Sequence, residues 1–119
     1  MITDEQAAAF GREWVEAWNA HDLDRILAHY HPDVEFRSPF VAKIAGEPSG
    51  LLKGVAALRP YFAAALKKFP DLEFTDLRTH VGVSSVTLTY RSVMNLYAAE
   101  VMVLDDRGRV VRVEAHYAR

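Results

Sequence analysis

The chain has 119 residues, no cysteine and a formal net charge of −2, and half of its residues are hydrophobic. These values predict a single domain, residues 1–119, with a core of its own, and they exclude disulfides, thiolate metal ligands and a cysteine nucleophile. The basic residues are scattered apart from Lys67-Lys68, and no segment resembles a signal peptide or a transmembrane run, so we expect a cytoplasmic protein without nucleic-acid or membrane partners.

Two helices are predicted in the first 30 residues. Thr3 and Gln6 have the spacing of a capping box, and apolar residues then recur with helical periodicity. Asp22 is a suitable N-cap for a second, shorter helix, whose apolar stripe runs to Tyr30 and stops at His31-Pro32. Together these segments predict an apolar helical hairpin.

The middle of the chain predicts a short strand, a loop and a third helix. Residues 34–38 alternate with period two, which places Ser38 on the inner face of the strand. Residues 41–53 are rich in turn-forming residues and predict a loop or weak hairpin over the opening of the fold. Residues 55–69 predict a helix, which Pro60 should kink because proline has no backbone N–H.

The remaining residues predict four strands. In the first, residues 72–81, the apolar phase changes between Phe74 and Leu77, which indicates a bulge or a bend. The later strands are expected at residues 86–91, 97–104 and 110–117. Helices followed by an antiparallel meander favour an α+β fold, with three N-terminal helices on one face of a strongly curved, mainly antiparallel sheet.

Glu100 is the candidate for chemistry, because it lies within an otherwise apolar run, residues 96–104. Burial of an unpaired carboxylate costs several kcal/mol or forces the group to become neutral. We therefore expect Glu100 either to serve the function of the protein or to be paired, for instance with an arginine, with Tyr90 or with Trp14.

The phase of this strand decides between two placements of Glu100. If Glu100 faces the interior with Ala98 and Met102, then Val101 and Val103 form part of an apolar outer face. Such a face needs cover, which predicts a homodimer through the outer side of the sheet. The opposite phase would place Glu100 in the dimer interface instead.

Four motifs carry a resemblance to a known family. They are Trp14-x-x-x-Trp18-Asn19-Ala20-His21-Asp22-Leu23, Tyr30-His31-Pro32-Asp33-Val34-x-Phe36-x-Ser38-Pro39-Phe40, Lys53-Gly54 and Asp105-Asp106-Arg107-Gly108-Arg109-Val110. The chain thereby resembles, over nearly its whole length, the SnoaL-like polyketide cyclase and ketosteroid isomerase group of the nuclear transport factor 2-like superfamily. The resemblance implies a cone-shaped, usually dimeric fold around an apolar cavity. It implies no single activity, because the superfamily contains several kinds of enzyme and non-catalytic binding domains.

The resemblance to ketosteroid isomerase also implies roles for three positions. Ser38, before Pro39-Phe40, stands where that enzyme has its carboxylate base, and Trp14 stands where it has a tyrosine that stabilises the oxyanion. Glu100 falls near the second donor of that enzyme, an aspartic acid that its apolar surroundings keep protonated. Because proton transfer typically contributes ~10²- to 10⁴-fold to the rate, loss of the base argues against an efficient isomerase of that type.

The sequence thus predicts binding of a small hydrophobic molecule, polyketide-, steroid- or terpenoid-like, in an apolar cavity. The binding is either coupled to acid-assisted isomerase or cyclase chemistry through Glu100, as acid or hydrogen-bond donor, or it is the role of a non-catalytic binding or dimeric interaction domain. No cofactor is expected, and no metal, because the five histidines lack the spacing of a metal site. The residues predicted to line the cavity are Trp14, Trp18, Phe36, Ser38, Phe40, Tyr61, Phe62, Leu88, Tyr90, Met102 and Tyr117.

Overall fold

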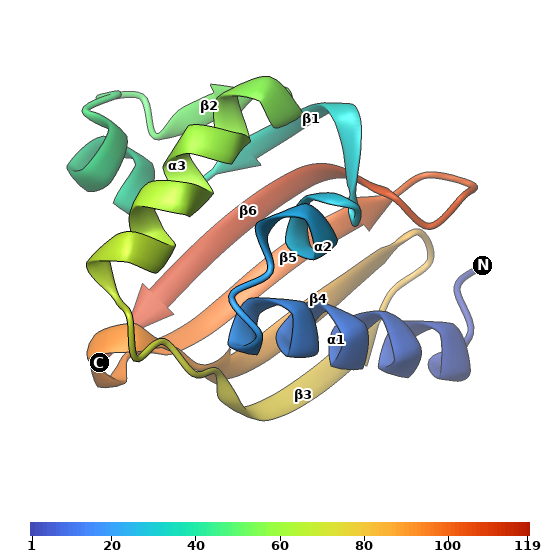
Figure 1. Cartoon of the computed structure of the whole chain (residues 1–119). Coiled ribbons are helices and arrows are strands. Elements are labelled where there is room, and N and C mark those ends of the chain that lie inside the picture. Colours follow the sequence, from blue (N-terminus) through green and yellow to red (C-terminus); the bar gives the residue numbers. More distant parts are fainter.

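The computed structural model describes residues 1–119 as a six-stranded sheet with its helices on one face (Figure 1). The helices are α1 (Asp4–Asn19), α2 (Leu23–Leu27) and α3 (Val55–Lys68). The strands are β1 (Tyr30–Arg37), β2 (Leu51–Lys53), β3 (Thr75–Val81), β4 (Ser85–Arg91), β5 (Tyr97–Leu104) and β6 (Val110–Ala118). Their order in the sheet is β2-β1-β6-β5-β4-β3, and every pair is antiparallel except β1 with β6. The predicted α+β fold with a mainly antiparallel sheet is confirmed.

Both N-terminal helices begin at the predicted caps. The Thr3 hydroxyl accepts a hydrogen bond from the Gln6 backbone N–H, and the Gln6 side chain accepts one from the Thr3 N–H. The Asp22 carboxylate accepts from the Arg25 N–H at the start of α2. Each cap satisfies backbone donors that have no partner within the helix. The start of each helix is therefore specified by its local sequence.

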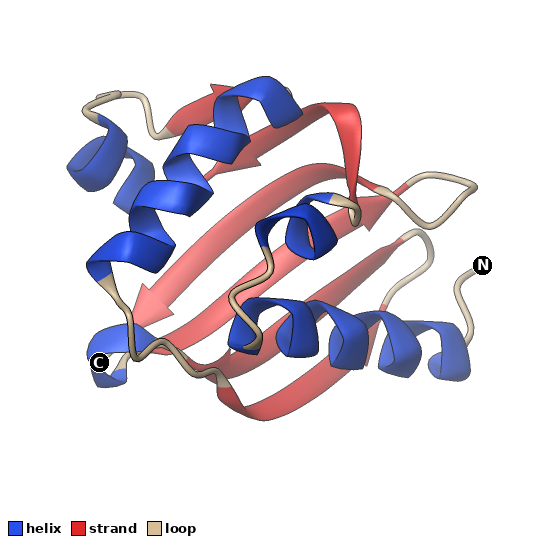
Figure 2. Ribbon diagram, in the orientation of Figure 1, coloured by secondary structure: helices blue, strands red, loops and turns tan.

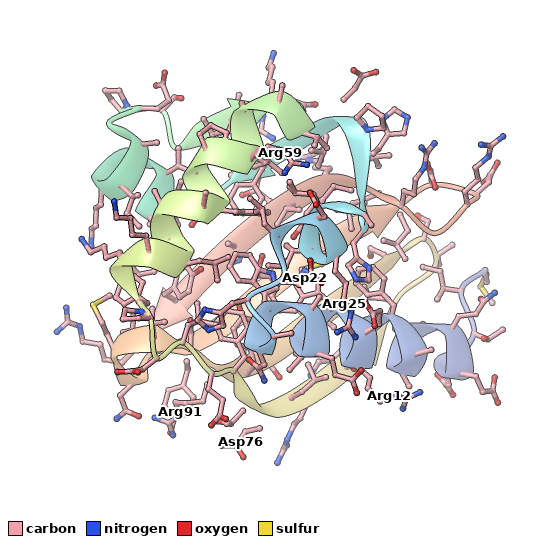
Figure 3. The ribbon with its side chains drawn as sticks, in the orientation of Figure 1. Arg12, Asp22, Arg25, Arg59, Asp76 and Arg91 are labelled. Atoms are coloured by element: carbon pink, nitrogen blue, oxygen red, sulfur yellow. The ribbon has the colours of Figure 1, made fainter.

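Ion pairs on the outside connect α2 to its neighbours. Arg25 contacts Glu13 of α1 at 2.5 Å, and Arg59 of α3 contacts Asp24 at 2.9 Å. Figure 3 shows Arg25 and Arg59 beside α2, on the helical side of the molecule. Since exposed pairs of this kind contribute only about 0–1 kcal/mol, they orient the helices, and apolar burial supplies most of the stability.

The close packing of α1 on the sheet depends on Gly11. A Cβ atom at this position would lie 2.8 Å from the Thr79 hydroxyl oxygen on β3 and 3.1 Å from the Leu88 side chain on β4. A larger residue would push α1 away from the sheet. Gly11 therefore brings Trp14 and Trp18, one and two turns further along α1, over the interior face of the sheet.

Two local predictions were wrong, and a third was right in part. Tyr30 was expected in the stripe of α2, but it begins β1 and pairs with Val110, because Pro32 disfavours helix in the residues before it. Residues 41–53, expected to be a loop or weak hairpin, contain a π-helical turn, η1 (Val41–Ala45), and the short strand β2, which pairs antiparallel with β1 (Figure 2). The strand expected from residue 72 starts at Thr75, because Leu72 and Phe74 are buried within an irregular connection from α3.

The predicted irregularity in β3 is present. The pairing of β3 with β4 changes register between Thr75 and Arg78, and Asp76 adopts a positive φ of 57° at that point. The bulge bends the sheet at its edge strand, β3, which runs alongside α1 (Figure 1).

The strand β5 has the phase that directs Glu100 inward. Ala98, Glu100 and Met102 are buried, with exposed fractions of 3%, 4% and 0%, whereas Val101 and Val103 on the other face are partly exposed. The homodimer through that outer face stays a prediction. None of the helices has both the length and the apolar composition needed to cross a membrane.

Candidate functional site

A cavity lies between helices α1 and α3 and the inner face of the sheet. Its volume is about 60 Å³, measured as the space open to the centres of water molecules. Fifteen of its 17 lining residues are hydrophobic, and the other two are Ser92 and Glu100. The hydrophobic lining residues are Trp14, Trp18, Tyr30, Phe36, Phe40, Ile44, Tyr61, Phe62, Ala65, Phe69, Leu72, Phe74, Tyr90, Val93 and Tyr117.

Small residues lie next to Glu100 on the inner face of the central strands. In the register of the sheet, Glu100 on β5 is opposite Ala115 on β6, and Ala98 lies between Tyr90 on β4 and Tyr117 on β6. All of these side chains share the inner face, because residues directly opposite one another point to the same side of a sheet. Of these residues, Glu100, Tyr90 and Tyr117 line the cavity, and the two alanines take up little space beside them.

The Glu100 carboxyl is held by one hydrogen bond. The Tyr90 hydroxyl, diagonal to Glu100 on the neighbouring strand, donates to Oε2 of the carboxylate. Glu100 takes part in no salt bridge, and no lysine, arginine or histidine lines the cavity. Of the partners that the sequence left open, an arginine, Tyr90 or Trp14, the structure provides Tyr90.

Burial changes the protonation of Glu100. Removal from water raises the pKa of its carboxyl from 4.5 to about 7, although the hydrogen bond from Tyr90 acts in the opposite direction. A carboxyl group with such a pKa is partly protonated at neutral pH, so it can donate or release a proton there. Glu100 thus gives an otherwise apolar cavity one group that exchanges protons in the physiological range.

The tyrosines around Glu100 remain neutral hydrogen-bonding groups. Burial raises the pKa of Tyr61 to about 12, and it raises the pKa values of Tyr30, Tyr90 and Tyr117 further above the ordinary value of 10. The nearby Glu100 carboxylate adds to each increase, because a second negative charge in the cavity is unfavourable. Glu100 is therefore the group in the cavity that titrates first as the pH rises.

The hydrogen-bonding capacity of Trp14 is already used within the protein. Its indole Nε1–H donates to the Tyr30 hydroxyl oxygen at 3.1 Å. Its ring stacks on Phe74 with a centroid separation of 5.7 Å. Trp14 therefore fixes the position of Tyr30, whose hydroxyl also lines the cavity and has no acceptor within the protein.

The structure brings together nine of the twelve predicted site residues in the cavity wall, which are Trp14, Trp18, Phe36, Phe40, Tyr61, Phe62, Tyr90, Glu100 and Tyr117. Leu88 and Met102 are fully buried beside the cavity without lining it. Ser38 is buried, and its hydroxyl accepts a hydrogen bond from the Phe40 N–H at 3.2 Å, as in a cap before proline. The lining residues outside the predicted set include Tyr30 and Phe74. The sequence pattern had placed Tyr30 in the apolar stripe of the second helix and Phe74 at the irregularity of the strand 72–81.

Phe40, Ile44 and Val93 are partly exposed lining residues from short turns, and we call this part of the wall the opening of the cavity. Phe40 lies directly before η1, and Ile44 lies within it. Val93 belongs to η2, a 3₁₀ turn (Val93–Asn95) between β4 and β5. The ring of Phe40 packs against Tyr117 at a centroid separation of 4.6 Å. An engineered apolar cavity that binds benzene has a volume of roughly 150 Å³. Since this cavity is smaller, at about 60 Å³, we expect a ring-shaped ligand to move some of these side chains when it binds.

Comparisons with known proteins agree with the fold. Residues 11–118 match the model of the SnoaL-like domain family. A SnoaL-like protein of unknown function from Burkholderia thailandensis is 47% identical, with 99% of this chain and 98% of that chain covered and a TM-score of 0.95. No curated protein matches the sequence.

Two further solved structures share the fold at lower identity. A steroid delta-isomerase from Pseudomonas aeruginosa is 25% identical, with 95% of this chain and 80% of that chain covered and a TM-score of 0.62. A nuclear transport factor 2-like protein from Anabaena variabilis is 15% identical, with 97% of this chain and 89% of that chain covered and a TM-score of 0.77. At such identity the second structure shows the shared fold alone.

Proposed function

This chain belongs to the SnoaL-like domain family, and we propose that its cavity binds a small, uncharged, ring-shaped molecule through one oxygen atom of that molecule. Protonated Glu100 donates a hydrogen bond to this oxygen, and the aromatic side chains pack against the ring. The observation that carries the proposal is the Glu100 carboxyl, which is buried in an apolar cavity, has no cation beside it and has a pKa of about 7.

The composition of the cavity wall supports an uncharged ligand. An anionic ligand would find no lysine, arginine or histidine in the wall and would be repelled by ionised Glu100. A cationic ligand would have one carboxylate available, but its charge would be surrounded by apolar groups. A neutral ketone or lactone loses little on transfer into such a cavity, provided that its oxygen receives a hydrogen bond.

The size of the cavity favours the smaller members of the predicted ligand class. Since a single ring already requires movement of side chains at the opening, a four-ring steroid would require a much larger rearrangement of η1 and η2. Within the polyketide-, steroid- or terpenoid-like molecules that the sequence suggests, we therefore propose a substrate with one ring, or two at most.

Acid-assisted isomerase or cyclase chemistry is the second function that we propose for this site. A hydrogen bond from Glu100 to a carbonyl oxygen stabilises the negative charge that develops there when the neighbouring carbon loses a proton. The cavity wall offers no second carboxylate or histidine to take up that proton, so water must accept it. The steroid delta-isomerase of Pseudomonas aeruginosa shares the fold and gives a precedent for such chemistry in it.

Binding of acetophenone tests the proposal, because this ketone has one ring, accepts hydrogen bonds and does not ionise. We expect its affinity, measured by calorimetry, to fall about tenfold or more between pH 5.5 and pH 8.5, as Glu100 loses the proton that it donates. Glu100→Leu should weaken binding at pH 5.5 by about fivefold or more, because the ketone oxygen then loses its hydrogen bond from the Glu100 carboxyl. Glu100→Gln, which keeps an N–H donor, should bind at both pH values.

The control for these variants is Glu114→Gln, which changes a partly exposed glutamate on the outer face of β6. Its affinity for acetophenone should follow that of the wild type at each pH. The proposal is overturned if Glu100→Leu binds the ketone as well as the wild type does, or if the affinity of the wild type is independent of pH. Exchange of the α-protons of acetophenone with solvent deuterium at saturating ketone, present in the wild type and lost in Glu100→Leu, which has no donor at this position, would identify the chemical step.

A further inference from the structure

Trp18 has a hydrogen-bond donor that the protein itself does not use. The side chain is 6% exposed and lines the cavity, and its indole Nε1–H is buried without any hydrogen-bond partner. Trp14, one turn earlier on the same helix, donates its Nε1–H to Tyr30. A buried N–H without an acceptor is rare, because it has lost its hydrogen bond to water and gained nothing in return.

The surroundings of Trp18 explain why no protein group accepts this hydrogen bond. Its ring is packed among aromatic rings, with centroid separations of 4.9 Å to Phe62, 5.6 Å to Phe74 and 6.1 Å to Trp14. An aromatic face accepts an N–H only weakly, so the edge-to-face contact with Phe62 is a poor substitute for an oxygen acceptor. Because Trp18 lines the cavity, a molecule bound there can supply a stronger acceptor.

Trp18 and Glu100 belong to opposite layers of the fold. Trp18 lies on α1, which covers the sheet, and Glu100 lies on β5, near the centre of the sheet (Figure 1). Both side chains line the same cavity, whose other walls are almost entirely apolar. Besides the hydroxyls of the tyrosines and of Ser92, the polar groups that a ligand between the two layers can meet are therefore Glu100 on the sheet side and the Trp18 indole on the helix side.

We propose that Trp18 is a specificity-determining residue, whose Nε1–H donates a hydrogen bond to a second acceptor oxygen of the ligand. This inference rests on the proposed function, because the first oxygen of the ligand is the one bound by Glu100. It narrows the ligand class to neutral, ring-shaped molecules with acceptor oxygens at two sides, such as diketones and keto ethers. The indole nitrogen only donates, so a ligand hydroxyl on this side can only accept the hydrogen bond, through its oxygen.

Two ligands of nearly equal size separate this role from general packing. The ligand 1,4-diacetylbenzene has two carbonyl oxygens, and 4-isopropylacetophenone has an isopropyl group in place of one acetyl group. We expect Trp18→Phe, which keeps an aromatic ring but lacks the N–H, to weaken binding of the diketone about 3- to 10-fold more than binding of the monoketone. The comparison is made within each variant at pH 5.5, so a general loss of packing cancels.

Trp14→Phe is the matched control, because it also removes an indole N–H from the cavity wall, but one that is already bonded to Tyr30. It should change the affinities of the two ligands by the same factor. The chain has only two tryptophans, so the indole N–H signals in a ¹⁵N-labelled sample can be assigned by these two variants. The diketone should move the Trp18 signal downfield, and the monoketone should not.

The outcomes distinguish this inference from the proposed function. If both ligands bind the wild type and Trp18→Phe weakens them equally, Trp18 contributes only packing, and the inference is wrong while the proposed function stands. The same conclusion holds if neither ligand moves the Trp18 indole signal downfield. If neither ligand binds the wild type, the proposed function fails, and the inference about Trp18 fails with it.

Discussion

Glu100→Gln should be more stable than the wild type at pH 9, with a free energy of unfolding about 3 kcal/mol higher. The structure buries the Glu100 carboxyl with Tyr90 as its hydrogen-bond partner and without a cation, which raises its pKa from 4.5 to about 7. Each pKa unit corresponds to about 1.4 kcal/mol of difference between the folded and unfolded states. Glutamine has almost the same shape and can still accept the hydrogen bond from Tyr90, but it carries no charge.

The sign of the effect follows from the proton balance of Glu100. Below pH 4.5 the carboxyl is protonated in both states, so the wild type and the variant should be equally stable. Between pH 4.5 and about 7 the unfolded chain releases the proton while the folded protein retains it, so the stability of the wild type falls as the pH rises. Above about pH 8 the loss is complete, and the advantage of the glutamine variant is largest.

Urea unfolding of both proteins at several pH values between 4 and 9 measures this difference. Glu114→Gln, on the partly exposed outer face, is the control and should shift the stability by no more than about 0.5 kcal/mol at any pH. A glutamine variant at position 100 that is no more stable than the wild type at pH 9 would show that Glu100 is not a destabilised, buried carboxyl. The cavity would then have no group that titrates near neutral pH.

Tyr90→Phe should have the second large effect, a loss of about 2–4 kcal/mol in the free energy of unfolding at pH 9. Above pH 7 Glu100 is ionised, and the variant leaves this buried charge without its hydrogen bond from the Tyr90 hydroxyl. At pH 5 the carboxyl is neutral, and the loss should be about 1 kcal/mol, as for an ordinary buried hydrogen bond. Urea unfolding at the two pH values gives the comparison.

Tyr97→Phe is the control for this experiment. The Tyr97 hydroxyl accepts a hydrogen bond from Arg91 at 2.7 Å on the surface, and the residue is 53% exposed, so its loss should cost about 0.5 kcal/mol or less at either pH. In a Glu100→Gln background the extra loss from Tyr90→Phe at high pH should disappear. An equal loss at pH 5 and pH 9 in the wild-type background would contradict the coupling of Tyr90 to the charge of Glu100.

Because a strand has a period of two, the sequence left two placements of Glu100 open, inward or outward, and the structure shows the inward one. Ala98, Glu100 and Met102 all point inward, and one residue of shift would have reversed them. The same period says which face a residue occupies but does not say what lies in front of that face. Leu88 and Met102 therefore share the inner face with Glu100 and are nevertheless packed in the core, outside the cavity wall.

Other features depended on contacts between distant segments. The strand β2 has only three residues, and it exists because it pairs with residues 35–37 of β1. The hydrogen bond between Trp14 and Tyr30 requires that Tyr30 enter β1, which the helical spacing of its neighbours obscured. The unsatisfied indole N–H of Trp18 could not be predicted, because the lack of an acceptor depends on all the residues that pack around the ring and not on the neighbouring sequence.

Direct titration of the Glu100 carboxyl carbon by ¹³C NMR, with Glu100→Gln to assign its signal, tests the central claim most directly. Without ligand the midpoint should lie at about pH 7, since burial favours the protonated form. With saturating acetophenone the midpoint should move higher, because the ketone binds the protonated carboxyl that donates to it. A midpoint near 4.5, or one that acetophenone leaves unchanged, would contradict the proposal that protonated Glu100 binds the oxygen of the ligand.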